Sequence, residues 1–139
     1  MHNAGDPERH LWPKETLVDL EQPFTDARGS IQPLVELMMR SAVLIDSNPG
    51  AVRANHYHKT DWHFCYVIKG AIDYYYRPFG DKGEPKRILV PEGKLVFTPP
   101  MVEHAMKFPE RTQFLTLSRN PRDQASYEAD VIRVELIKP

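Results

Sequence analysis

Residues 50–70 read GAVRANHYHKTDWHFCYVIKG, and this stretch decides the expected fold. His56 and His58 are two residues apart, so on a β-strand both side chains point to the same face. The segment 62–68 is rich in aromatic and β-branched residues, which are typical of strands. The stretch therefore predicts two neighbouring strands that carry histidines towards one site.

Strand signals continue on both sides of this stretch. Short apolar runs broken by turn residues recur about every 8–12 residues. The expected strands are 41–46, 52–57, 62–68, 71–79, 87–90, 95–98, 102–108, 112–117 and 131–137. Segment 34–40 reads as either a short helix or a strand, and 127–130 reads as one helical turn. The pattern predicts an all-β protein, folded as an antiparallel sandwich or barrel.

Composition narrows the function classes. The chain has 139 residues, which suits one domain, and 13 prolines, an excess that disfavours a helical bundle. The formal net charge of −1 argues against binding nucleic acid or a membrane surface by bulk charge. One cysteine excludes an intramolecular disulfide and a thiolate-only zinc site within one chain. Without an apolar signal segment, we expect a cytoplasmic protein.

We divide the chain into an N-terminal arm, residues 1–22, and a β-barrel domain, residues 23–139. The arm is polar, and its only apolar anchors are Leu11, Trp12, Leu17, Val18 and Leu20. It either pairs with another subunit or is a partly ordered terminus. A homodimer is the expected assembly, because it is the commonest one.

Four of the six histidines form the expected site, and the other two, His2 and His10, lie in the arm. Imidazole ligands suit Zn, Fe, Ni or Cu, and neutral nitrogens leave the charge of a divalent ion free to polarise a bound water or carbonyl. The alternative is that the histidines have unrelated roles in the core or on the surface. We predict a divalent transition metal held by His56, His58, His63 and His104.

The spacing of these histidines resembles the two motifs of the cupin superfamily. Gly50, His56, His58, His63 and Gly70 match the first motif, G(X)5HXH(X)3–4E(X)6G, with histidine at the usual glutamate position. Residues 93–108 resemble the second motif, G(X)5PXG(X)2H(X)3N, with Met101 replacing its second glycine and Phe108 its asparagine. The resemblance implies a double-stranded β-helix, or jelly-roll barrel, which agrees with the strand pattern.

A finer resemblance is to the dTDP-sugar 3,4-ketoisomerases and, more loosely, to cupin domains of polysaccharide biosynthesis. It rests on residues 24–30, 53–59 and 127–133. These ketoisomerases work without a metal, and the resemblance implies imidazoles that shuttle protons between sugar carbons. A metal-bound imidazole cannot act as a general base, so the sugar and metal interpretations conflict for His56 and His58. We favour the metal because His63 and His104 have no place in the metal-free scheme.

Further candidate residues surround the histidines. Catalytic candidates are His56, His58, Asp61 and Glu103, of which the two carboxylates would act as a base or orient an imidazole, with plain surface exposure as the alternative. Substrate-binding candidates are Arg53, Tyr74, Tyr76, Met106 and Phe108. Arg53 is expected to bind a diphosphate or a carboxylate, and the alternative is a surface ion pair. Tyr57 and Lys59 are expected to point away from the site, and Cys65 is expected to be a buried apolar residue.

Three functions remain open. The first is an isomerase or epimerase that acts on a nucleotide-linked keto-sugar or a related carbohydrate precursor. The second is a non-haem Fe(II) dioxygenase of the small cupin type. The third is a non-enzymatic cupin that binds a small ligand, which four protein ligands on a tetrahedral ion would favour because no coordination position stays open.

Overall fold

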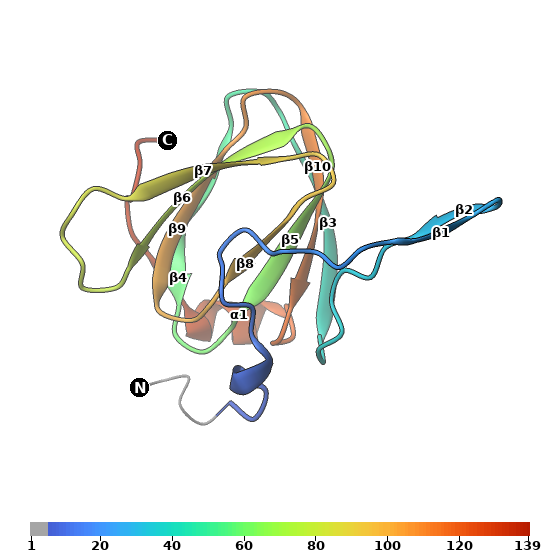
Figure 1. Cartoon of the computed structure of the whole chain (residues 1–139). Helices are drawn as coiled ribbons and strands as arrows, with labels where there is room; N and C mark the ends of the chain where they lie inside the picture. The colour runs from blue at the N-terminus through green and yellow to red at the C-terminus, as the bar shows by residue number, and fades with distance from the viewer. Residues whose placement is uncertain (1–5) are drawn as a thin grey trace.

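Two antiparallel sheets face each other in the computed structural model of the chain, which describes residues 6–139 (Figure 1). The strand order of the first sheet is β3 (Ser41–Ser47), β10 (Thr112–Ser118), β5 (His63–Lys69) and β8 (Leu95–Thr98). The order of the second is β11 (Val131–Arg133), β4 (Val52–His58), β9 (Val102–Lys107), β6 (Ala71–Pro78) and β7 (Lys86–Pro91). The protein is an all-β jelly roll, as predicted.

The main core lies between the two sheets. Side chains alternate in and out along each strand, and β10 follows this alternation over its whole length. Val67 and Phe114 from the first sheet meet Ile72 and Tyr74 from the second, and all four are almost fully buried. Phe108, just after β9, completes this layer. The expected strands are therefore present, with the last one shortened to Val131–Arg133.

A second apolar cluster covers the outer face of β5 and β8. It consists of Trp62, Phe64, Leu95 and Phe97, which sequence alternation leaves outside the main core. Segment 34–40 lies over this cluster and forms neither a helix nor a strand. It buries its apolar side chains by packing them on the cluster. Residues Val35, Leu37 and Met39, all of one parity, make this contact.

The N-terminal arm binds its own barrel. Thr16 accepts a backbone hydrogen bond from Phe97, and Val18 donates one to Leu95, so this segment pairs with the free edge of β8. Trp12 and Val18 also pack on the outer cluster. Of the two interpretations of the arm, neither foresaw pairing within the same chain. His2 lies outside the described residues.

Three smaller elements complete the described chain. The hairpin of β1 (Phe24–Asp26) and β2 (Gly29–Ile31) projects from the barrel (Figure 1). A short 3-10 helix, η1 (Arg9–Leu11), lies in the arm, and the helix α1 (Gln124–Asp130) contains the expected helical turn. None of the helices within residues 6–139 has the length and apolar character that crossing a bilayer requires.

Candidate metal centre

Three histidines from two adjacent strands meet inside the barrel. His56 on β4 lies opposite His104 on β9 in the strand register, and His58 follows on the same face of β4. The ring centroid of His56 lies 4.7 Å from those of both His58 and His104. One nitrogen from each ring lies within 4.8 Å of the other two. We call these three residues the histidine triad.

A β-bulge places His56 opposite His104. Ala54 and Asn55 have φ values of 68° and 55°, and the strand register shifts between Ala54 and His56. Such a bulge inserts one extra residue and re-aims the side chains that follow it. The Asn55 side chain stabilises this conformation, because its amide oxygen accepts backbone hydrogen bonds from Leu136 and Ile137.

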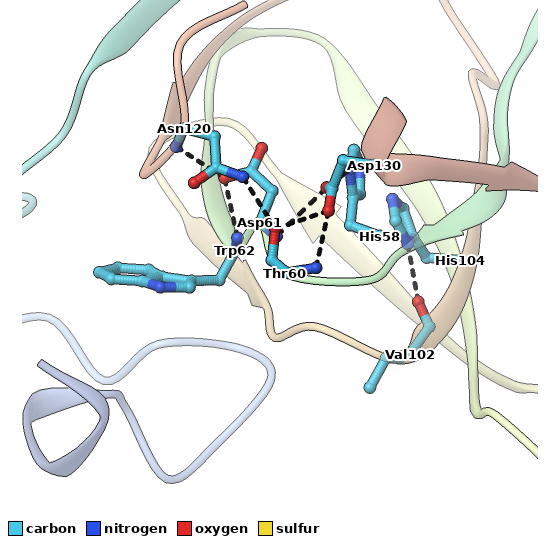
Figure 2. A network of polar contacts seen from close by, with 8 residues as sticks. All are labelled: His58, Thr60, Asp61, Trp62, Val102, His104, Asn120 and Asp130. Carbon is cyan, nitrogen blue, oxygen red and sulfur yellow. Dashed lines mark hydrogen bonds and ion pairs between the residues drawn. The ribbon is translucent and has the colours of Figure 1, made fainter. Parts of the chain in front are cut away.

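Hydrogen bonds orient two of the three rings (Figure 2). Nδ1 of His58 donates to the Asp130 carboxylate at 3.0 Å, and Nδ1 of His104 donates to the Val102 carbonyl at 3.0 Å. Asp130 is an acceptor because the hydrogen bonds it receives outweigh its burial and lower its pKa to about 2. Both rings therefore keep the lone pair of Nε2 for a ligand in the cavity, which is the usual arrangement of metal-binding histidines.

Two imidazoles of the triad, His56 and His104, are uncharged at physiological pH. Burial and the neighbouring imidazoles lower the pKa of His56 to about 2, and burial lowers that of His104 to about 3. Crowded, uncharged imidazoles are good ligands for a divalent cation but poor hosts for protons. This donor set therefore fits Zn²⁺ or Fe²⁺, and no carboxylate belongs to the same group of three.

His63 lies beside the triad without joining it. Its ring centroid is 5.2 Å from that of His104 and 5.5 Å from that of His58. Within residues 6–139, His63 belongs to no group of three donors that meets the 4.8 Å distance. Its Nδ1 atom lies 3.8 Å from Sγ of Cys65. The expected four-histidine site is thus three histidines with a fourth next to them.

The triad opens into a cavity of about 320 Å³. This volume is at the lower end of the range for small-molecule sites. Its wall combines polar and apolar residues. The lining residues are Ile45, Val52, Arg53, Ala54, His56, His58, Asp61, His63, Cys65, His104, Met106, Phe114, Thr116, Ser118, Arg122 and Tyr127.

Asp61 is the carboxylate that lines this cavity. Its Oδ1 atom accepts both backbone hydrogen bonds that Asp61 receives, from Trp62 and Asn120 at 2.9 Å each. Burial raises the pKa of Asp61 to about 6, against the lowering effect of these two hydrogen bonds. Asp61 therefore combines access to the cavity with a pKa suited to proton transfer near neutral pH.

Glu103, the other carboxylate that the sequence suggested as catalytic, does not lie in the site. It follows Val102 and precedes His104, so strand alternation turns it to the opposite face of β9. There its carboxylate forms an ion pair with Arg77 at 2.7 Å. Proximity to a histidine in sequence does not place a side chain near it on a strand.

The expected substrate-binding residues divide into two groups. Arg53 and Met106 line the cavity, and the Arg53 guanidinium is held by Ser47 Oγ at 2.8 Å. Tyr74 and Phe108 are fully buried in the core, and Tyr76 packs against it, so none of the three lines the cavity. They belong to the core between the sheets or pack against it, and the cavity does not extend to them.

Three residues of the site were not predicted from the sequence as site residues. Asp130 orients His58, while Arg122 stacks on Tyr127 with its guanidinium carbon 4.7 Å from the ring centroid. Tyr127 in turn lies 6.0 Å from the His58 ring. Tyr127 and Asp130 belong to segment 127–133, which the resemblance to the ketoisomerases already singled out.

Comparison with known proteins supports the same fold. The cupin domain family matches residues 43–118. No curated protein sequence is significantly similar to this chain. Among solved structures, a 3,4-ketoisomerase from Helicobacter canadensis is 18% identical, with a TM-score of 0.70 over 88% of this chain and 92% of that one.

Two further solved structures resemble the chain. The QdtA 3,4-ketoisomerase of Thermoanaerobacterium thermosaccharolyticum, in complex with TDP, is 22% identical, with a TM-score of 0.65 over 81% of this chain and 82% of that one. The dTDP-4-dehydrorhamnose 3,5-epimerase of Sulfolobus tokodaii is 15% identical, with a TM-score of 0.69 over 90% of this chain and 86% of that one. At these identities the likeness shows a shared fold.

Proposed function

Because the chain belongs to the cupin domain family, we propose that it is a metal-binding isomerase or epimerase of a nucleotide-linked keto-sugar. The observation that carries this proposal is the convergence of three imidazole donors in a cavity that a carboxylate also lines. His56, His58 and His104 would hold the metal, and Asp61 would move the proton. Three protein ligands leave a coordination position open, as catalytic sites require.

The division of labour follows from the ligand chemistry. A divalent cation held by the triad would polarise a keto group and acidify the carbon next to it. His56 and His58 then have no lone pair for proton transfer, which leaves Asp61 as the base. Asp61 would take the proton from that carbon. It would return the proton to the neighbouring carbon in an isomerisation, or to the opposite face of the same carbon in an epimerisation. Its raised pKa, about 6, suits both steps.

The cavity supports a substrate with a small reacting part and a charged remainder. A volume of about 320 Å³ accommodates a sugar ring but not a whole nucleotide-sugar. Arg53 and Arg122 are exposed side chains of its wall and would meet the diphosphate. Two proteins of similar fold are named for such compounds. One is a 3,4-ketoisomerase in complex with TDP, and the other is a 3,5-epimerase of a dTDP-sugar.

Two measurements test the proposal. Elemental analysis of protein purified without added metal should give one divalent transition metal per chain, which His56→Ala and His104→Ala should each remove. Incubation with dTDP-4-keto-6-deoxyglucose in D₂O should then introduce deuterium at a carbon next to the keto group, observed by NMR. Activity in metal-free protein would contradict the proposed role of the metal. Metal-loaded protein that exchanges no deuterium would contradict the proposed isomerase or epimerase activity.

The other hypotheses from the sequence predict different results in the same experiments. Oxygen consumption by the Fe(II)-loaded protein would support a dioxygenase instead. Tight binding of the nucleotide-sugar without exchange would support a non-enzymatic binding protein. The homodimer, the cytoplasmic location and the absence of nucleic-acid or membrane partners also stay predictions.

A further inference from the structure

The imidazole of His63 has no role in the proposed chemistry, although it is buried in the wall of the cavity. It comes from β5 in the first sheet, opposite the strands that carry the triad. Its side chain is 6% exposed, and it lines the same cavity as the triad. A buried polar ring needs a hydrogen-bonding partner, and a substrate in the cavity would provide one for His63.

The contacts of Cys65 indicate which nitrogen of His63 carries the proton. Cys65 Sγ lies 3.8 Å from Nδ1 of His63 and 3.4 Å from Oγ1 of Thr116. Burial raises the pKa of Cys65 to about 12, so the sulfur keeps its proton. The Thr116 hydroxyl can donate to the sulfur while the thiol donates to Nδ1, and this order satisfies each group in turn.

The opposite direction of these hydrogen bonds is less favourable. In that arrangement Nδ1–H of His63 would donate to sulfur, which is a weak acceptor, and Nε2 would face the cavity as a nitrogen that can only accept. With the proton on Nε2, the strong donor instead faces a space that a ligand oxygen or water enters. The chemistry of this small network therefore favours the Nε2–H form of His63.

We propose that His63 is a hydrogen-bond donor to the keto oxygen of the substrate, through Nε2–H, and is not a fourth metal ligand. This inference rests on the proposed function and deepens it, because it assigns a catalytic group for a carbonyl substrate. A protonated nitrogen has no lone pair for a metal, in agreement with the position of His63 outside the triad. The open coordination position next to the triad is then preserved.

The donor acts on the charge that develops during the reaction. Removing a proton next to a keto group shifts negative charge to its oxygen, and a fixed donor there lowers the barrier. His63 donates from Nε2–H while its Nδ1 atom is occupied by the Cys65 thiol. The proton transfer itself stays with Asp61, so the two residues have separate tasks.

The protonation of His63 is measurable without any turnover. In the Zn²⁺-loaded protein, long-range ¹H–¹⁵N NMR should show a histidine that is protonated at Nε2 and whose signal is missing in His63→Leu. A His63 signal protonated at Nδ1, or shifted as a zinc-bound nitrogen, would overturn the inference. The measurement on the wild-type protein needs no variant to fold.

Two variants test the role in the reaction. His63→Leu, which removes the donor, should keep one Zn²⁺ per chain and lower kcat on dTDP-4-keto-6-deoxyglucose about 10²–10³-fold, as for loss of an oxyanion donor. Cys65→Val should keep Zn²⁺ and weaken the preference for Nε2–H, with a smaller loss of kcat. Loss of zinc in His63→Leu to the extent seen in His104→Ala would overturn the inference.

The failure of this inference differs from the failure of the proposed function. Wild-type protein that exchanges deuterium, together with a His63→Leu variant of equal kcat, overturns the inference alone. Wild-type protein without exchange overturns the proposed isomerase and, with it, the keto oxygen as acceptor. The NMR result still decides whether His63 is a donor or a metal ligand.

Discussion

The Asp130 carboxylate accepts a hydrogen bond of 3.0 Å from Nδ1 of His58 and so joins the end of α1 to the triad. Its Oδ1 atom accepts two more from Thr60, at 2.7 Å from the backbone and 2.6 Å from the hydroxyl. Both carboxylate oxygens are thus acceptors, which an amide cannot reproduce. One buried residue therefore orients a ligand ring and the loop after it (Figure 2).

Asp130→Asn is expected to weaken metal binding. The amide has one accepting oxygen and one donating nitrogen, so it satisfies either His58 or Thr60 but not both. Loss of such a partner of a ligating histidine typically lowers metal affinity about 10–100-fold. Zn²⁺ titration against a competing chelator measures this. Glu128→Gln, on the exposed side of the same helix, is the control and should bind as the wild type does.

Asp61→Asn is expected to abolish the proton transfer while leaving the metal in place. Loss of a general base typically lowers the rate about 10²–10⁴-fold. The wild-type rate should rise with pH as Asp61 ionises, and the residual rate of the variant should lack this rise. Glu103→Gln is a matched control, because it removes the same charge on the outer face of β9. Equal losses in both variants would contradict the assignment.

The strand pattern and the position of the triad were predictable from the sequence. His56 and His58 share a face by alternation, and the second motif placed His104 beside them, as the ring distances of 4.7 Å and 5.8 Å show. These inferences succeed because they depend only on strand periodicity and on a return of the chain to the adjacent strand. The first is a local property of the sequence, whereas the second was inferred from the resemblance to the second cupin motif.

Positions that depend on packing were not predictable. Tyr74 and Met106 are paired across β6 and β9 and face the same interior, yet only Met106 lines the cavity. Alternation specifies a face, whereas the extent of the cavity depends on how the two sheets close. The arm is a second case, because its partner is the outer apolar cluster on β5 and β8, which alternation alone does not reveal.

Met101→Gly is expected to stabilise the protein. Met101 stands where the second cupin motif has glycine, and its φ of 62° is a left-handed conformation that costs a side-chain-bearing residue about 1–2 kcal/mol. Glycine removes this strain but adds about 0.5–1 kcal/mol of backbone entropy loss. The net gain of roughly 0.5–1 kcal/mol is measurable by guanidinium unfolding. Met101→Ala, which keeps the strained conformation, should show no gain.

Gly70→Ala is expected to destabilise the protein. Gly70 has a φ of 96°, and a Cβ atom there would lie 2.5 Å from the Arg111 carbonyl oxygen and from Thr112 Oγ1. The turn must shift to relieve this contact, at a cost of about 2–4 kcal/mol for overpacking plus backbone strain. Gly50→Ala is the control, since its φ of 82° brings strain but no close contact. Its smaller loss in urea unfolding would separate the two causes.

The metal-free protein is expected to lose stability as the pH falls below 6.5. Burial lowers the pKa of His56 to about 2, that of His104 to about 3 and that of His63 well below its usual value. The unfolded chain therefore binds protons below pH 6.5 that the folded chain does not. Each histidine then removes about 1.4 kcal/mol of unfolding free energy for every unit of pH.

Asp61 opposes this loss over part of the same range. Its pKa is about 6 when folded, against 3.8 otherwise, so between pH 6 and 4 the folded chain binds one proton that the unfolded chain lacks. Three histidines against one carboxylate leave a net slope of roughly 2.7 kcal/mol per pH unit. Urea unfolding of chelator-treated protein at pH 5, 6 and 7 measures it, and His10→Gln, in the exposed helix η1, should leave the slope unchanged. Equal stability at pH 5 and pH 7 would mean that His56, His63 and His104 take up protons in the folded protein as readily as in the unfolded chain. Protonated His56 and His104 would not be the neutral donors that a divalent cation needs.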